Sequence, residues 1–187
     1  MKTVAEIEIT TEGISLNGHP VETKGVGADM LNEAYRHYVN DYPKFFKMDG
    51  LSKLGFLASE LLLQQLDEER FVPREDRAVV LFNRSGSIEA DRHYQSTISD
   101  ADNFFPSPSV FVYTLPNIVT GEIAIRNKSL GETSFCVLDH QDEQKMQQVI
   151  EGAFLDGVTT SILTGWVDYA DHSHFSANIK LITNKNE

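Results

Sequence analysis

The stretch ETSFCVLDHQDEQKMQQVIEGAFLDGVTTSILTGWV (132–167) decides the fold class. Its two ends, 132–138 and 159–167, are rich in β-branched and aromatic residues, which predicts two strands. Between them, apolar residues from Met146 to Phe154 recur at helical spacing and predict a helix over 141–156. A strand, a helix and a strand in this order usually form a right-handed crossover between parallel strands. The chain is therefore expected to be an α/β protein.

The rest of the chain continues this alternation of strands and helices. Strands are predicted as a hairpin within 4–22, turning at Asn17-Gly18, and at 77–83 and 175–182; helices are predicted over 27–40, 50–66, 88–98 and from Pro116 to Lys128. The Pro- and aromatic-rich residues 103–116 predict a loop that packs inward. We expect one domain, residues 1–187, with a mixed sheet covered by helices.

The composition bounds the classes of function. The 16 basic and 28 acidic residues give a formal net charge of −12, so the chain lacks the basic surface that a nucleic-acid binder needs. No apolar run approaches the roughly 18 residues of a membrane span. Glu6 and Glu8 stand where a signal peptide needs an apolar core. The single cysteine, Cys136, excludes an internal disulfide. We expect a cytoplasmic protein.

Four stretches carry motifs that occur in this order in one known family. They are FFKMDGLSKLGFLASELLL (45–63), DRAVVLFNRSGSIEADRHY (76–94), FFPSPSVFVYTLPNIVTGEIAI (104–125) and the segment 131–168. The first is similar to a Met-Asp-x-x-Ser helix, the second to a strand with a Gly-containing turn, and the third to a Ser-Pro…Pro-Asn…Gly-x-Ile-Ala segment. Together they resemble the N-terminal half of the β-ketoacyl synthases of the thiolase superfamily. The chain is also similar to the short synthase-like proteins of aryl-polyene and flexirubin-type clusters.

The resemblance implies a thiolase-like half-fold and a relationship to acyltransferases of fatty-acid and polyketide synthesis, with no cofactor. The family places a nucleophilic cysteine at the elbow between strand and helix, where the helix N-terminus stabilises a thiolate. Here that position falls on His140, and Cys136 lies four residues earlier, inside the predicted strand. The two histidines that the family uses for decarboxylation belong to a C-terminal half that lies beyond residue 187.

These departures predict a non-catalytic subunit, similar to the chain-length-factor subunits that lack the cysteine and pair with an active synthase. The expected partners are an active ketosynthase subunit and, through it, an acyl-carrier protein, in a homo- or heterodimer. The interface is expected around strand 132–138 and the helix from Pro116 to Lys128. The residues expected to line an acyl pocket or this interface are Phe104, Phe105, Phe111, Asn117 and Phe135. Without the C-terminal half, an apolar face of the sheet or of a helix is expected to be exposed.

Two other functions stay open. The chain could be an acyl-thioester transferase or hydrolase that uses His140 with Asp139, or Cys136 with His140. It could also be a scaffold homodimer without an acyl pocket. The pair His172 and His174 is expected on a surface loop, and because no third ligand stands at convincing spacing, no metal site is predicted.

Overall fold

The computed structural model describes residues 1–102 and 104–184. Its strands are β1 (Lys2–Thr10), β2 (Ile14–Leu16), β3 (His19–Val21), β4 (Arg77–Asn83), β5 (Thr133–Val137), β6 (Ser161–Asp171) and β7 (His174–Thr183). Its helices are α1 (Gly27–Tyr38), α2 (Gly50–Leu63), α3 (Ile88–Ser96), α4 (Pro108–Phe111), α5 (Ile118–Asn127) and α6 (Glu143–Ala153), with short 3₁₀ segments η1 (Pro43–Lys47), η2 (Val112–Thr114) and η3 (Phe154–Asp156). The predicted strands and helices are thus confirmed, with ends shifted by a few residues.

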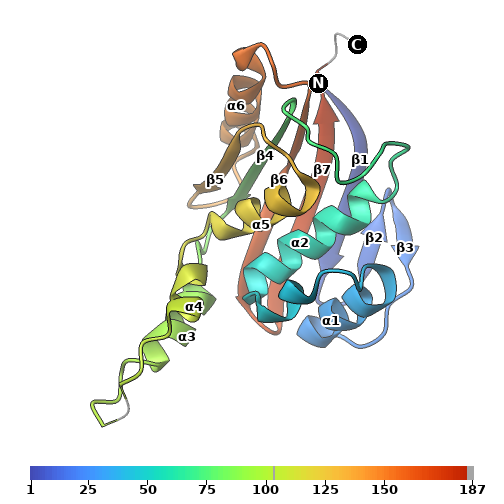
Figure 1. Ribbon diagram of the computed structural model, residues 1–187. Helices are drawn as coiled ribbons and strands as arrows, with labels where there is room; N and C mark the ends of the chain where they lie inside the picture. The colour runs from blue at the N-terminus through green and yellow to red at the C-terminus, as the bar shows by residue number, and fades with distance from the viewer. Residues whose placement is uncertain (103, 185–187) are drawn as a thin grey trace.

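The described strands form one mixed sheet of seven strands in the order β3-β2-β1-β7-β6-β4-β5 (Figure 1). Strand β4 pairs in parallel with β5 on one side and with β6 on the other. Helix α6 connects β5 to β6, so the crossover predicted from residues 132–167 joins two strands that flank a third. Strands β6, β7 and β1 then pair antiparallel. These pairings confirm the α/β class and the mixed sheet.

The main core lies between one face of the sheet and the helices α1, α2 and α5. Strand β1 supplies Ile7 and Ile9, and β7 supplies Ala177 and Ile179, at alternate positions as a half-buried strand requires. Helix α2 is buried almost all round, because α5 and the sheet contact it from different sides. Asp49 caps α2 by accepting a 3.1 Å hydrogen bond from the Ser52 amide.

The other face of the sheet is covered only in part. Helix α6 packs Met146 and Ile150 against β4 and β6, forming a second, smaller core. Beyond it, β1 and β7 present polar side chains to solvent: Glu6, Glu8, Ser176, Asn178 and Lys180. Of the two alternatives expected, an exposed apolar face of the sheet is therefore wrong for these strands, whereas exposed apolar side chains do occur on the segment with α4 and η2, at Phe111 and Val112. The same alternation that sends the apolar residues toward α2 places charged and amide groups on this face.

Helices α3 and α4 form an arm, residues 88–102 and 104–115, that projects away from the body (Figure 1). Phe104 and Phe105 lie near its tip and are 57% and 74% exposed. The prediction that residues 103–116 pack inward as a loop is wrong: the segment contains α4 and η2, and Phe104, Phe105 and Phe111 are exposed, whereas Tyr113 packs against the main core (residue 103 is outside the described residues). The physical reason is that few apolar side chains of the arm find a partner on the body: α3 buries only Ala90, and Phe111 contacts Tyr94 within the arm.

The charged segment between α2 and β4 is fixed by ion pairs that the sequence pattern did not reveal. Glu60 of α2 is fully buried and pairs with Arg70 at 2.7 Å and with Arg126 of α5 at 3.1 Å. The Phe71 ring lies against both guanidinium groups.

Across the described residues, no helix combines the length and apolarity that crossing a membrane requires.

Candidate functional site

His140 lies in the elbow between β5 and α6, which is the location expected from the sequence. Asp142 caps α6 by accepting a 3.0 Å hydrogen bond from the Lys145 amide. Nδ1 of His140 lies 3.0 Å from Oδ1 of Asp139, and this contact lowers the pKa of Asp139. Both side chains are exposed, at 64% and 76%. The pair therefore lies in water, where its electrostatic effect on a reacting group is weak.

Cys136 lies in β5 on the side that faces α6, at the margin of the second core. Burial raises the pKa of its thiol, and the charge of Glu132 raises it further. A reactive cysteine needs the opposite shift. Among the described residues, no hydrogen bond joins the Cys136 sulfur to a base. Its surroundings are those of a small apolar side chain within a strand.

A groove of about 660 Å³ runs beside α6 on the same side of the sheet as the elbow. Its floor contains Met146, Ile150, Trp166 and Ile182. The Oγ1 atom of Thr164 is buried there without a hydrogen-bond partner among the described residues. Its rim is polar, and Gln141 and Glu143 come from the start of α6. The groove is open to solvent and does not exclude water from the elbow.

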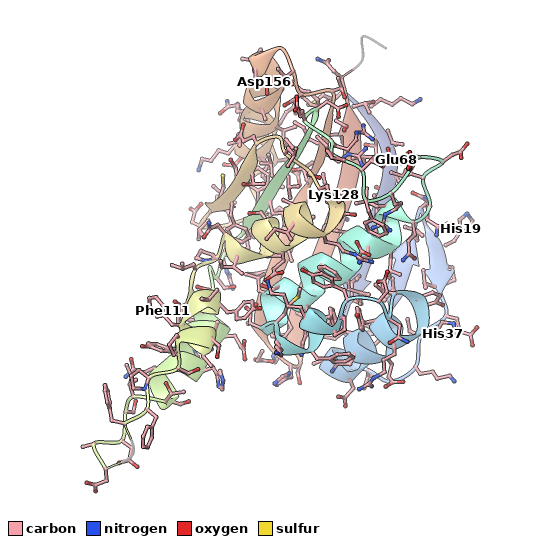
Figure 2. The ribbon with its side chains drawn as sticks, viewed as in Figure 1. His19, His37, Glu68, Phe111, Lys128 and Asp156 are labelled. Atoms are coloured by element: carbon pink, nitrogen blue, oxygen red, sulfur yellow. The ribbon has the colours of Figure 1, made fainter. Side chains whose placement is uncertain are left out.

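The side chains expected to line an acyl pocket do not form one pocket. Phe104 and Phe105 lie near the arm tip, and Phe111 contacts Tyr94 within the arm, with ring centroids 5.3 Å apart. Asn117 is exposed at the start of α5. Phe135 packs against the main core from β5. Figure 2 shows Phe111 on the arm, away from the sheet. An interface role for these residues remains a prediction.

The histidines His172 and His174 lie at the exposed turn between β6 and β7, as expected. Nδ1 of His174 contacts Asp171 at 2.9 Å, whereas Nδ1 of His172 lies 3.1 Å from the Tyr169 hydroxyl. The two rings are thus held by different partners.

A carboxyl group with a raised pKa lies on the opposite side of the sheet from the elbow. Burial raises the pKa of Asp49 to about 6, although its hydrogen bonds to Ser52 oppose the shift. Asp49 lines a cleft between the arm and the body, together with Lys53 and Glu122. The Met-Asp motif pointed to Asp49 alone, and no sequence pattern indicated that α1, α5 and the arm would meet beside it.

We expect Asp49→Asn to stabilise the protein at neutral and basic pH. The folded pKa of Asp49, about 6, lies above its ordinary value of 3.8, so the folded state binds the proton more tightly and loses stability as pH rises through that window. Asn keeps the cap without the buried charge. The gain should be about 1–3 kcal/mol near pH 8 and should vanish near pH 4. Urea unfolding at both pH values measures it; an equal gain at both would contradict the assignment.

The comparisons with known proteins identify the fold of the chain. No family model matches the sequence, and no curated protein matches it. Solved structures do match: a chain of the ishigamide ketosynthase/chain length factor has a TM-score of 0.70 at 16% identity, covering 98% of this chain and 62% of its own length. The protein therefore has the ketosynthase/chain length factor fold, which confirms the thiolase-like half-fold.

Two complexes give the particular neighbours. A chain of the ketosynthase ApeO in complex with its chain length factor ApeC, from Xenorhabdus doucetiae, has a TM-score of 0.62 at 12% identity, covering 98% of this chain and 78% of its own. A chain of AntDE:AntF, a type II polyketide synthase acyl-carrier protein in complex with its ketosynthase, has a TM-score of 0.58 at 13% identity. The match covers 98% of the present chain and 62% of the AntDE:AntF chain.

Proposed function

We propose that this chain is a non-catalytic, chain-length-factor-like subunit that pairs with an active ketosynthase. The observation that supports the proposal is the elbow of this fold, where His140, the residue that the sequence resemblance assigns to the family's nucleophile position, is exposed to solvent. Condensation in that family needs a thiolate in a protected site. His140 supplies no sulfur, and the nearby thiol of Cys136 has a raised pKa. The chain would then contribute shape and stability rather than chemistry.

The proposed interface includes the edge of the sheet at β5 and the arm. Strand β5 pairs only with β4 among the described strands, so its outer edge offers backbone donors and acceptors to another strand. The arm adds exposed apolar side chains: Phe104, Phe105, Phe111, Val112 and Leu115. A contiguous patch of such residues is typical of a surface that is covered in the assembled protein. A stable pair should bury on the order of 1,200–2,000 Å² or more.

The test compares the condensation activity of the intact ketosynthases of the source organism with and without this chain. We expect the chain alone to give no condensation product from malonyl and acyl thioesters. With its cognate synthase, it should raise product yield or change the chain length. The double variant His140→Ala, Cys136→Ala should support the synthase as well as the unaltered chain. Thioester hydrolysis or transfer by the chain alone, lost in this variant, would establish the enzyme alternative instead.

A further inference from the structure

The cleft between the arm and the body has the properties of a small-molecule site. It has a volume of about 680 Å³ and is walled by α1, η1, the start of α2, the arm, α5 and the β6–β7 turn. Small-molecule sites range over roughly 300–1,000 Å³ and combine apolar walls with a few convergent polar groups. The apolar part of this lining includes Leu31, Met48, Val110, Val112, Tyr113 and Tyr169. The cleft opens on the face of the sheet opposite α6, apart from the elbow.

Two buried acceptor atoms at the cleft lack donors. Glu122 of α5 is only 4% exposed; its Oε1 atom pairs with Nζ of Lys44 at 2.6 Å, but its Oε2 atom receives no hydrogen bond from any described residue. The Oδ1 atom of Asn32 on α1 is likewise buried without a donor in the described part of the chain. Buried acceptors without partners are uncommon and costly.

Two ammonium groups at the cleft lack close carboxylate partners. Neither Lys47 nor Lys53 forms an ion pair within 4.0 Å among the described residues, although both line the cleft. Burial lowers the pKa of Lys53, and the charges of Asp49 and Glu89 only partly offset this. Burial, followed by the charge of Glu122, raises the pKa of Tyr113 to about 12. Such shifts gather at binding sites more often than elsewhere.

We propose that the cleft binds a small zwitterion with an apolar body, of the class of the aliphatic amino acids. The ligand's ammonium group would donate to Glu122 and Asn32, and its carboxylate would accept from Lys47 and Lys53. Its side chain would lie on the apolar walls. A simple anion would give no hydrogen bond to the acceptor atoms of Glu122 and Asn32. It would also be repelled by the carboxylates of Asp49 and Glu89. A simple amine would leave the lysines unmet. This inference does not depend on the proposed pairing with a synthase.

Three probes that share one apolar body separate these cases: leucine, isocaproate, which lacks the amine, and isoamylamine, which lacks the carboxylate. Each is titrated into the full chain while amide shifts are followed by NMR. We expect saturable shifts at residues 28–32, 47–53 and 109–113 with leucine, at a dissociation constant on the order of 1 mM. Both analogues should bind at least about tenfold more weakly. Equal or tighter binding of either analogue overturns the proposal.

Variants locate the binding. Lys53→Met and Glu122→Gln should each weaken leucine binding at least about tenfold. The matched controls are Lys145→Met and Glu151→Gln, exposed positions of α6 on the other side of the sheet, which should leave binding unchanged. The proposal is overturned if leucine gives no saturable shift up to about 10 mM, if the shifts lie outside the cleft, or if Lys53→Met binds leucine like the unaltered chain.

Discussion

Phe111→Glu should strongly weaken the pairing of this chain with its ketosynthase while leaving the chain folded. Phe111 lies on the arm, is 48% exposed, and makes its aromatic contact with Tyr94 of the same arm. A carboxylate there would be buried without a partner once the arm is covered. Substitutions at the centre of an interface cost about 2 kcal/mol or more, so affinity should fall at least about 30-fold. Sedimentation of the mixed proteins measures the loss.

The matched control for this variant is Leu155→Glu. Leu155 is 85% exposed in η3, beyond α6 and away from both the arm and the edge of β5. The same change in charge should leave the affinity within about threefold of the unaltered chain, because exposed substitutions outside an interface cost little. Equal losses from both variants, or none from Phe111→Glu, would remove the arm from the proposed interface.

Gly165→Ala should cause a large loss of stability. Gly165 stands in β6 opposite Ile179 of β7, and a Cβ there would lie 1.9 Å from the Asn178 carbonyl oxygen. Backbone atoms cannot move aside as a flexible side chain can, so β6 and β7 would have to separate in the middle of the sheet. We expect a loss of about 3–5 kcal/mol, or failure to fold. Thermal unfolding should show a decrease of roughly 10 °C or more.

Gly121→Ala is the control for that prediction. Gly121 lies within α5, and a Cβ there would meet nothing within 4 Å. Alanine is the better helix former by about 1 kcal/mol, so this variant should be as stable as the unaltered chain or slightly more stable. If both glycine variants lost stability alike, the close approach of β6 and β7 at Gly165 would not be the cause.

Periodic segments of the sequence predicted the fold well. The apolar spacing within 141–156 identified α6, and the unbroken apolar run RAVVLFN identified β4, which is buried along its whole length. The spacing of apolar residues differs between a helix and a strand, because each element turns a different set of positions toward the core. This spacing therefore identifies the type and the order of the elements along the chain. The motifs in 45–125 then indicated the particular α/β fold that the structural comparison confirms.

The errors came from features that depend on the surroundings of a segment. The aromatic residues of 104–113 indicated burial, but whether such residues are buried depends on a partner surface, and of these residues only Tyr113 packs against the body. The apolar sheet face was expected from the family's longer architecture, whereas the alternation in β1 and β7 already placed Glu6, Glu8 and Lys180 on it. The cleft unites residues from six separate stretches of the chain, so no local pattern could reveal it.

The most direct test of the account is the mass of the complex that forms when this chain is co-expressed with each intact ketosynthase of its source organism. We predict that one of them co-purifies with the chain as a stable species containing both subunits. Sedimentation at micromolar concentration should show the two subunits dissociating when the arm is substituted. A chain that stays a soluble monomer in the presence of every such synthase would contradict the proposal that it is a ketosynthase partner.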